Sequence, residues 1–142
     1  MPTSTTKIFC IGLSKTGTTS LARALEILGY KTRDYIGVTS YFAGDLTSIN
    51  LQEIDANEAF TDTPIPSFYK QLDEKYPNSK FILTTRNMED WLRSCKKQFT
   101  KRMVEKQNEA TCQLHTDLYD CFEFDQEKYA NGYTPLVNGE LD

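Results

Sequence analysis

The stretch KIFCIGLSKTGTTSLARALEILG, residues 7–29, decides the fold that we expect for this chain. Its start, Lys7–Ile11, is a short apolar run, as in a strand that is buried on both faces. A loop bounded by two glycines follows at residues 12–17, and residues 18–28 carry apolar side chains at helical spacing before Gly29 ends the helix. This order of strand, glycine loop and helix presents backbone N–H groups and a positive helix end to a phosphate.

Three further strands and several helices are expected along the chain. The strands are expected over residues 31–35, 58–61 and 80–85, and the helices over residues 48–55, over residues 66–76, from a cap at Asn87 onward, and in later segments to about Asn131-Gly132. Strands that alternate with helices form right-handed βαβ units around a parallel sheet. We therefore expect an α/β protein with a three-layer fold like that of P-loop nucleoside triphosphatases, in which helices flank a central parallel sheet.

Length and composition describe an ordinary globular domain. The chain has 142 residues, 39% hydrophobic and 25% charged, so we expect a single domain over residues 1–142. No apolar run approaches the ~20 residues of a membrane span, and the polar N-terminus predicts no signal peptide, so we expect a cytoplasmic protein. A net charge of −4 argues against nucleic-acid binding, and one histidine without a C-x-x-C pair argues against a zinc site. The four cysteines are expected to be reduced thiols.

The glycine loop differs from the triphosphatase loop G-x-x-x-x-G-K-[ST] in the position of its lysine. The glycines have the right spacing, but Thr18 follows Gly17, and the lysine of the loop is Lys15. In the triphosphatase pattern the lysine reaches the β and γ phosphates and a hydroxyl residue holds Mg²⁺. The displaced lysine therefore argues against a simple ATPase or GTPase. Another P-loop nucleotide-binding protein or a small-molecule kinase stays open as an alternative, and so does a glycine-rich turn without a ligand.

The segment KTGTTS, residues 15–20, resembles the 5′-phosphosulfate loop of sulfotransferases, and residues 12–30 resemble a broad sulfotransferase-like family. TDTP at residues 61–64 and KFILTTRNMEDWLRS at residues 80–94 look like later blocks of that family, and the resemblance covers roughly residues 7–131. It implies an enzyme that transfers a sulfuryl group from 3′-phosphoadenosine-5′-phosphosulfate (PAPS) to a hydroxyl or amine acceptor, without a metal. The resemblance assigns donor binding to Lys15, Thr16, Gly17, Thr18, Thr19 and Ser20.

The second donor motif of sulfotransferases is an arginine at the end of a strand and a serine about two helical turns later, which together hold the 3′-phosphate. Arg86 follows FILTT, and Ser94 lies eight residues further on. The planar guanidinium makes paired, charge-assisted hydrogen bonds to phosphate, and α/β sheets bind ligands at the carboxyl ends of their strands. Taken alone, Arg86 is equally compatible with a surface residue paired with Glu89 or Asp90, and Ser94 with a neutral surface position.

The catalytic roles are assigned by the same resemblance together with the chemistry of transfer. Lys15 is expected to stabilise the charge that develops on the bridging oxygen as it leaves with the nucleotide. An acceptor hydroxyl needs a general base, and Asp62 is the candidate because it follows a predicted strand. It also lies 24 residues before Arg86, which the resemblance implies is close to where the base falls in related enzymes. The alternative for Asp62 is a turn-forming role, since D-x-P is a common turn signal. His115, the only histidine, is a second candidate base that we expect to be structural or exposed.

Other features leave two interpretations each. Residues 93–106 contain six basic side chains, either a solvated helix face or a positive rim that attracts an anionic ligand. Trp91 either stacks on adenine or lies in the core.

The acceptor, a small molecule or a glycan or lipid, is expected in a pocket built by residues 36–54 and the late helices. Sulfotransferases normally continue into a further strand and a final helical segment, so we expect the C-terminal part of the usual fold to be missing, and an inactive nucleotide-binding relative stays open.

Overall fold

A four-stranded parallel sheet is the centre of the structure, a computed structural model that describes residues 6–38, 40–121 and 123–137. The strands are β1 (Ile8–Cys10), β2 (Thr32–Asp34), β3 (Ala59–Thr61) and β4 (Lys80–Ile82), in the order β2-β3-β1-β4. Phe9 of β1 pairs with Phe60 on one side and with Phe81 on the other. The four expected strands and their parallel arrangement are confirmed, although β4 ends earlier than its apolar run suggested.

Strand β1 buries side chains on both faces of the sheet, as its continuous apolar run predicts. Ile8 and Cys10 pack with Leu25 on one face. Phe9 points to the other face, where its ring stacks on Phe60 with centroids 5.5 Å apart in the largest hydrophobic cluster. Because neighbouring residues of a strand point to opposite faces, one short strand joins two separate cores.

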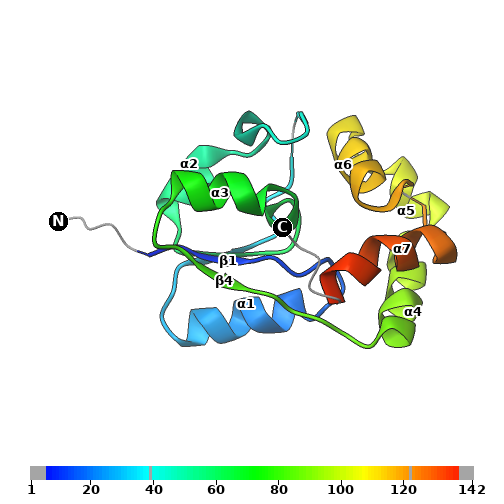
Figure 1. The fold of residues 1–142 in the computed structure, drawn as a ribbon, viewed down its shortest axis with the longest axis horizontal. Coiled ribbons are helices and arrows are strands. Elements are labelled where there is room, and N and C mark those ends of the chain that lie inside the picture. The colour runs from blue at the N-terminus through cyan, green and yellow to red at the C-terminus, as the bar shows by residue number, and fades with distance from the viewer. Residues whose placement is uncertain (1–5, 39, 122, 138–142) are drawn as a thin grey trace.

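Helices cover both faces and make the fold three-layered (Figure 1). Helix α1 (Thr18–Ile27) covers one face, and helices α2 (Leu51–Ala56) and α3 (Tyr69–Lys75) cover the other. Short 3₁₀ turns at Leu46–Ser48 and Ile65–Phe68 lead into α2 and α3, in place of the longer uniform helices that the sequence suggested. The expected α/β architecture with a parallel sheet between helices is confirmed.

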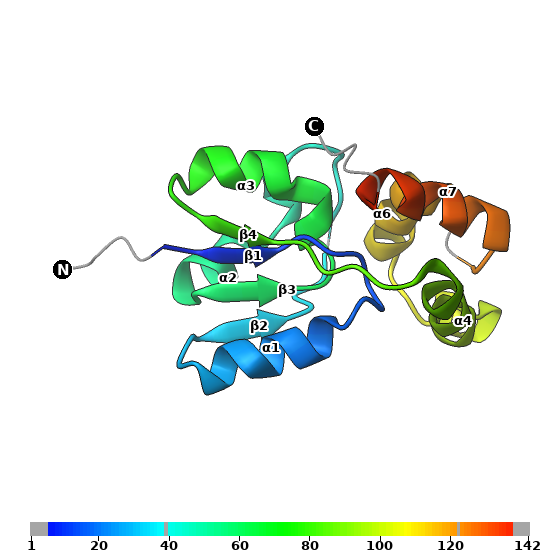
Figure 2. The same cartoon turned by 60° about the horizontal axis from the view of Figure 1, so that its bottom comes forward.

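A group of four helices lies beyond the carboxyl ends of the strands (Figure 2). These helices are α4 (Met88–Gln98), α5 (Lys101–Glu105), α6 (Glu109–Tyr119) and α7 (Gln126–Val137). The expected cap of α4 is confirmed, because the Asn87 side chain accepts a hydrogen bond from the Asp90 amide at 3.2 Å. The loops that leave the carboxyl ends of the strands therefore face this helical group.

The expectation that the last helix ends near Asn131-Gly132 is wrong, since α7 continues to Val137. Gly132 provides close approach instead of a stop. A Cβ atom there would lie 2.7 Å from the Leu118 carbonyl oxygen and 2.8 Å from a ring carbon of Tyr119. The next residue, Tyr133, is buried and stacks on Trp91 with ring centroids 4.5 Å apart. Tertiary packing thus overrides the low helix propensity of glycine.

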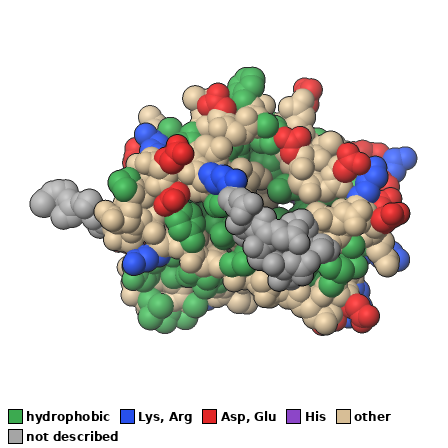
Figure 3. Space-filling model, in the orientation of Figure 1, with side chains coloured by type: hydrophobic (Ala, Val, Ile, Leu, Met, Phe, Trp, Pro, Cys, Tyr) green, Lys and Arg blue, Asp and Glu red, His purple; other side chains and the backbone are tan. Residues whose placement is uncertain are grey.

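The far end of α1 presents an apolar surface. Ile27 and Leu28 are 72% and 73% exposed, and Figure 3 shows hydrophobic side chains gathered on that side, with charged side chains of both signs elsewhere on the same face. In the described part of the chain, no helix is both long enough and apolar enough to cross a membrane.

Candidate functional site

The loop between β1 and α1 is tied to the chain that follows β4. At Gly12 a Cβ atom would lie 1.9 Å from the Thr84 hydroxyl oxygen and 2.6 Å from its carbonyl oxygen, so only glycine permits this crossing. The Thr16 hydroxyl donates to the Leu13 carbonyl at 2.5 Å and lies 2.7 Å from the Thr84 hydroxyl. Thr16, which the sequence assigned to donor binding, therefore turns its side chain into the loop and holds the shape of the loop.

The backbone of the loop leaves the start of α1 open to an anion. Lys15 and Gly17 have φ angles of 70° and 91°, in the left-handed region. Gly17 is the N-cap residue, and among the described residues no side chain caps α1. The first N–H groups of a helix have no partner within the helix, and the helix dipole adds positive potential there. This helix start can therefore bind a phosphate.

A cavity of about 240 Å³, which we call the loop cavity, lies at this helix start. It is lined by Lys15, Gly17, Thr18, Thr19, Ser20, Asp62, Arg86 and Ser94. Three distant parts of the chain meet here: the loop with the first turn of α1, the end of β3, and the segment from β4 into α4. Apart from Thr16, the structure thus brings together every residue that the sequence assigned to the site.

Arg86 joins the two predicted motifs directly. Its guanidinium donates to the Lys15 carbonyl at 3.2 Å, although 71 residues separate them. Tyr133 of α7 fixes the backbone of Arg86, because the Tyr133 hydroxyl accepts from the Arg86 amide at 2.6 Å and donates to the Arg86 carbonyl. One tyrosine therefore holds both backbone groups of the residue that is predicted to bind a phosphate.

Trp91 lies in the core and not on a nucleotide-facing surface. Its side chain is fully buried, and its indole N–H donates to the Ser14 carbonyl at 2.8 Å. The ring also stacks on Tyr133 with planes 25° apart. Since the C=O and N–H of a trans peptide point in opposite directions, this hydrogen bond turns the Lys15 amide away from Trp91. Trp91 thus orients the glycine loop by a contact on the core side of the loop.

Asp62 follows β3 directly and is held in the left-handed region at φ 68°. One carboxylate oxygen accepts from the Ser14 hydroxyl at 2.5 Å and from the Thr63 amide at 2.7 Å. Burial raises the pKa of Asp62 above its usual range, and the charge of Asp34 adds to this, while the hydrogen bonds from Ser14 and Thr63 lower it. A carboxylate in a fixed position with a raised pKa suits a proton acceptor.

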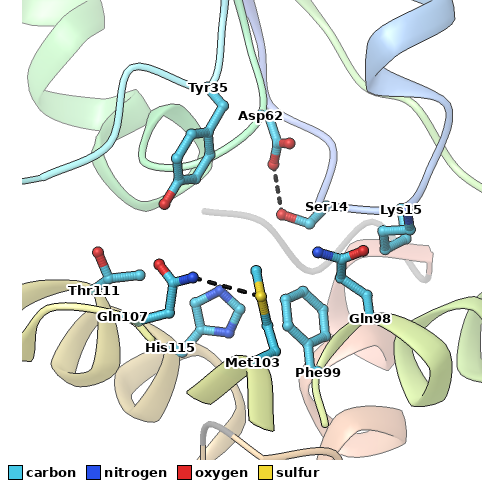
Figure 4. A pocket seen from close by; sticks show the side chains of 10 residues that line it. All are labelled: Ser14, Lys15, Tyr35, Asp62, Gln98, Phe99, Met103, Gln107, Thr111 and His115. Atoms are coloured by element: carbon cyan, nitrogen blue, oxygen red, sulfur yellow. Dashed lines mark hydrogen bonds between the residues drawn. The ribbon is translucent and has the colours of Figure 1, made fainter. Parts of the chain in front are cut away.

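A second cavity, of about 290 Å³, adjoins the first one, and we call it the helical cavity (Figure 4). It is lined by Ser14, Lys15, Tyr35, Asp62, Gln98, Phe99, Met103, Gln107, Thr111 and His115. Both cavities are thus lined by Lys15 and Asp62. The late helices line this cavity, whereas none of the described residues within 36–54 does.

Comparison with known proteins identifies the family. A family model described as "Sulfotransferase domain" matches residues 7–129. The chain belongs to the sulfotransferase domain family. A curated relative, Ava biosynthesis cluster protein M of Aspergillus versicolor, is 32% identical over an alignment that covers 62% of this chain and 41% of the relative. The chain therefore spans about two fifths of the length of that relative, and the resemblance seen in the sequence is confirmed.

In this sulfotransferase-domain protein His115 is buried and not exposed. Only 4% of it is accessible, and its ring lies against Phe99 with centroids 4.8 Å apart. Burial lowers the pKa of His115 to about 4, so the imidazole is neutral at neutral pH. In Figure 4 the ring lies across the helical cavity from Asp62.

The basic segment after Arg93 forms a solvated face of this sulfotransferase domain. Arg93 pairs with Asp90 at 2.8 Å, and both side chains are exposed. None of the six basic side chains of residues 93–106 lines the loop cavity. Within the described ranges, no group of three or more histidine, cysteine, aspartate or glutamate side chains is placed to hold a metal ion.

Sequence reasoning missed several residues of this site, among them Ser14, Tyr35 and Tyr133. Ser14 donates to Asp62, Tyr35 lines the helical cavity, and Tyr133 fixes Arg86. Ser14 carried a usable signal, because it adjoins Lys15 inside the glycine loop. Tyr35 and Tyr133 lie outside any motif, and only the folded chain brings them to the site.

Replacement of His115 by glutamine should remove a pH-dependent loss of stability. Because the pKa of His115 is lowered, the unfolded chain binds more protons than the folded chain between about pH 6.5 and about pH 4. The free energy of unfolding therefore falls as the pH falls through that range. From about pH 7 to about pH 5 the original protein should lose about 2 kcal/mol relative to His115→Gln, measured by urea unfolding. Asp62 is present in both proteins, so its opposite effect cancels. Parallel pH profiles would contradict the buried neutral histidine.

Proposed function

We propose that the loop cavity binds PAPS and that its sulfuryl group passes to a hydroxyl or amine of an acceptor in the helical cavity. The observation that carries this proposal is that Lys15 and Asp62 line both cavities. A donor in one cavity and an acceptor in the other would therefore meet between a cation and a carboxylate. The family supports the reaction class, and the proposal adds the donor and the residues.

The donor is proposed to bind through its two phosphate-bearing ends. The amides of residues 17–19 and the hydroxyls of Thr18 and Thr19 would hold the 5′-phosphate at the start of α1. Arg86 and Ser94 would hold the 3′-phosphate, because both line the same cavity and the guanidinium offers several N–H donors in one plane. The hydrogen bond from the Arg86 guanidinium to the Lys15 carbonyl supports this assignment, since a held side chain loses less freedom on binding.

The transfer step uses the two shared residues. The acceptor oxygen forms a bond to sulfur while the bond from sulfur to the bridging phosphate oxygen breaks, and the acceptor proton passes to Asp62. The Lys15 ammonium stabilises the charge on the departing oxygen, and positioned cations contribute strongly to such steps. The Ser14 hydroxyl holds the Asp62 carboxylate in place. The raised pKa of Asp62 makes this carboxylate a better proton acceptor than that of an ordinary aspartate.

Replacement of Arg86 by alanine should weaken binding of adenosine 3′,5′-bisphosphate by about 10–100-fold, the ~1.5–3 kcal/mol of a charge-assisted hydrogen bond. Binding of adenosine 5′-phosphate should change little, because it lacks the 3′-phosphate. Isothermal titration calorimetry without Mg²⁺ measures both affinities, and a separate titration measures the affinity for Mg-ATP. The matched control is Arg93→Ala, an exposed arginine of α4 outside the loop cavity, which should leave both unchanged. Equal weakening of both nucleotides by Arg86→Ala, or binding only of Mg-ATP, would refute the assignment.

Replacement of Asp62 by asparagine should lower kcat about 10²–10⁴-fold, as loss of a general base does, while bisphosphate affinity stays within a few-fold. Transfer of labelled sulfate from PAPS to 2-naphthol measures the rate. In the original protein the rate should fall as pH falls through the raised pKa of Asp62, because a protonated carboxyl cannot accept the proton. An active Asp62→Asn variant together with an inactive His115→Gln variant would move the base role to His115. Bisphosphate binding without any transfer would identify a non-catalytic relative.

A further inference from the structure

The helical cavity has one end lined by charged side chains, where the proposed transfer takes place, and a remaining part lined by uncharged side chains. Lys15 and Asp62 supply its reactive end and also line the loop cavity. The other described residues that line it carry no charge at neutral pH: Ser14, Tyr35, Gln98, Phe99, Met103, Gln107, Thr111 and His115. A charged group deep in this cavity would lose water without gaining a counter-ion. The cavity therefore favours an uncharged occupant.

The neutral part is itself divided into an apolar and a polar region. In Figure 4 the Phe99 ring and the Met103 side chain lie along one wall, while the Tyr35 hydroxyl points toward the side where Gln107 and Thr111 lie, away from Lys15. The Gln107 amide nitrogen lies 3.5 Å from the Met103 sulfur, which is a weak acceptor. An oxygen of a ligand would be a better partner for this amide.

Tyr35 is held over the cavity by an uncommon backbone conformation. Its φ is 57°, and its amide donates to the Thr61 carbonyl at 2.9 Å, one residue before Asp62. Left-handed backbone at a bulky residue carries strain and is enriched at functional sites. The end of β3 thus positions Asp62, the proposed base, and also the Tyr35 hydroxyl, which lies where the remote end of a ligand would bind.

The volume limits the size of the occupant. A cavity of about 150 Å³ holds one benzene molecule, so about 290 Å³ holds a flat molecule of one to two rings. The value also lies at the lower end of the ~300–1,000 Å³ that small-molecule pockets span. The volume therefore sets the size of the part of an acceptor that enters the cavity.

We propose that the acceptor is an uncharged, flat molecule of one to two rings, with the reacting hydroxyl at one end and a second neutral polar group at the other end, bound by Tyr35 and Gln107. This inference rests on the proposed function and adds the substrate class and two specificity-determining residues. Phe99 and Met103 provide the apolar contact for the rings. The reacting hydroxyl lies at the end where Asp62 and Lys15 meet the loop cavity.

Three naphthalene ligands test the inference by calorimetry, with adenosine 3′,5′-bisphosphate bound so that Lys15 is already engaged. 2,6-Dihydroxynaphthalene should bind about 3–10-fold tighter than 2-naphthol, as one added neutral hydrogen bond provides. 6-Hydroxy-2-naphthoate should bind at least about tenfold weaker than 2-naphthol. Equal or tighter binding of the carboxylate, or no binding of any of the three ligands, would overturn the inference.

Variants assign the preference to the named residues. Tyr35→Phe and Gln107→Leu should each reduce the preference for 2,6-dihydroxynaphthalene over 2-naphthol to about twofold or less. Gln107→Lys should make 6-hydroxy-2-naphthoate the tightest ligand of the three. Gln113→Lys, the same change on the exposed side of α6 and outside the helical cavity, should leave the order unchanged. Identical behaviour of the two lysine variants would remove Gln107 from the specificity role.

The same titrations separate this inference from the donor assignment. If the bisphosphate does not bind but 2,6-dihydroxynaphthalene still binds tighter than 2-naphthol, the proposed donor site fails and the acceptor inference stands. If the bisphosphate binds and Arg86→Ala weakens it, while the ligands show no preference, the acceptor inference fails and the donor assignment stands.

Discussion

The stack of Trp91 on Tyr133 is the interaction on which the rest of the site depends. Trp91 holds the Ser14 carbonyl of the glycine loop, and Tyr133 holds the backbone of Arg86, so one pair of rings positions both phosphate-binding segments. The pair is buried, and low polarity strengthens the hydrogen bonds that it makes. The Arg86 guanidinium closes the arrangement by donating to the Lys15 carbonyl. The geometry of the loop cavity is therefore a property of helices α4 and α7 as much as of the sheet.

The sheet brings the segments of the site to one edge, and the helices form the wall opposite that edge. Strands of three residues each deliver the glycine loop, Asp62 and the segment before Arg86 to one edge. Helices α4 to α6 then form the far wall of the helical cavity, which stands beyond that edge. Gly132 allows α7 to lie close to α6, and this brings Tyr133 within reach of Trp91. The family match over residues 7–129 covers the sheet and helices α4 to α6 and ends before Gly132 and Tyr133.

Local patterns in the sequence predicted the local parts of this site. The apolar run of β1, the glycine loop and the helical spacing after Thr18 depend on neighbouring residues, and the structure has all three. Arg86 and Ser94 were found through the resemblance to a family motif, and both line the loop cavity. The continuation of α7 through Gly132 and the contacts of Tyr133 depend on how helices pack, which no short window of sequence records.

Nucleotide affinity of the Tyr133→Phe variant tests most directly whether the aromatic pair positions the donor site. The variant keeps the ring on Trp91 and removes the hydroxyl that holds Arg86. Adenosine 3′,5′-bisphosphate should bind about 3–10-fold more weakly, while adenosine 5′-phosphate stays within about twofold, the effect of one hydrogen-bonding group on one phosphate. Tyr119→Phe, in the same buried cluster, should change neither. Equal affinities for the original protein and Tyr133→Phe, or equal weakening of both nucleotides, would contradict the account.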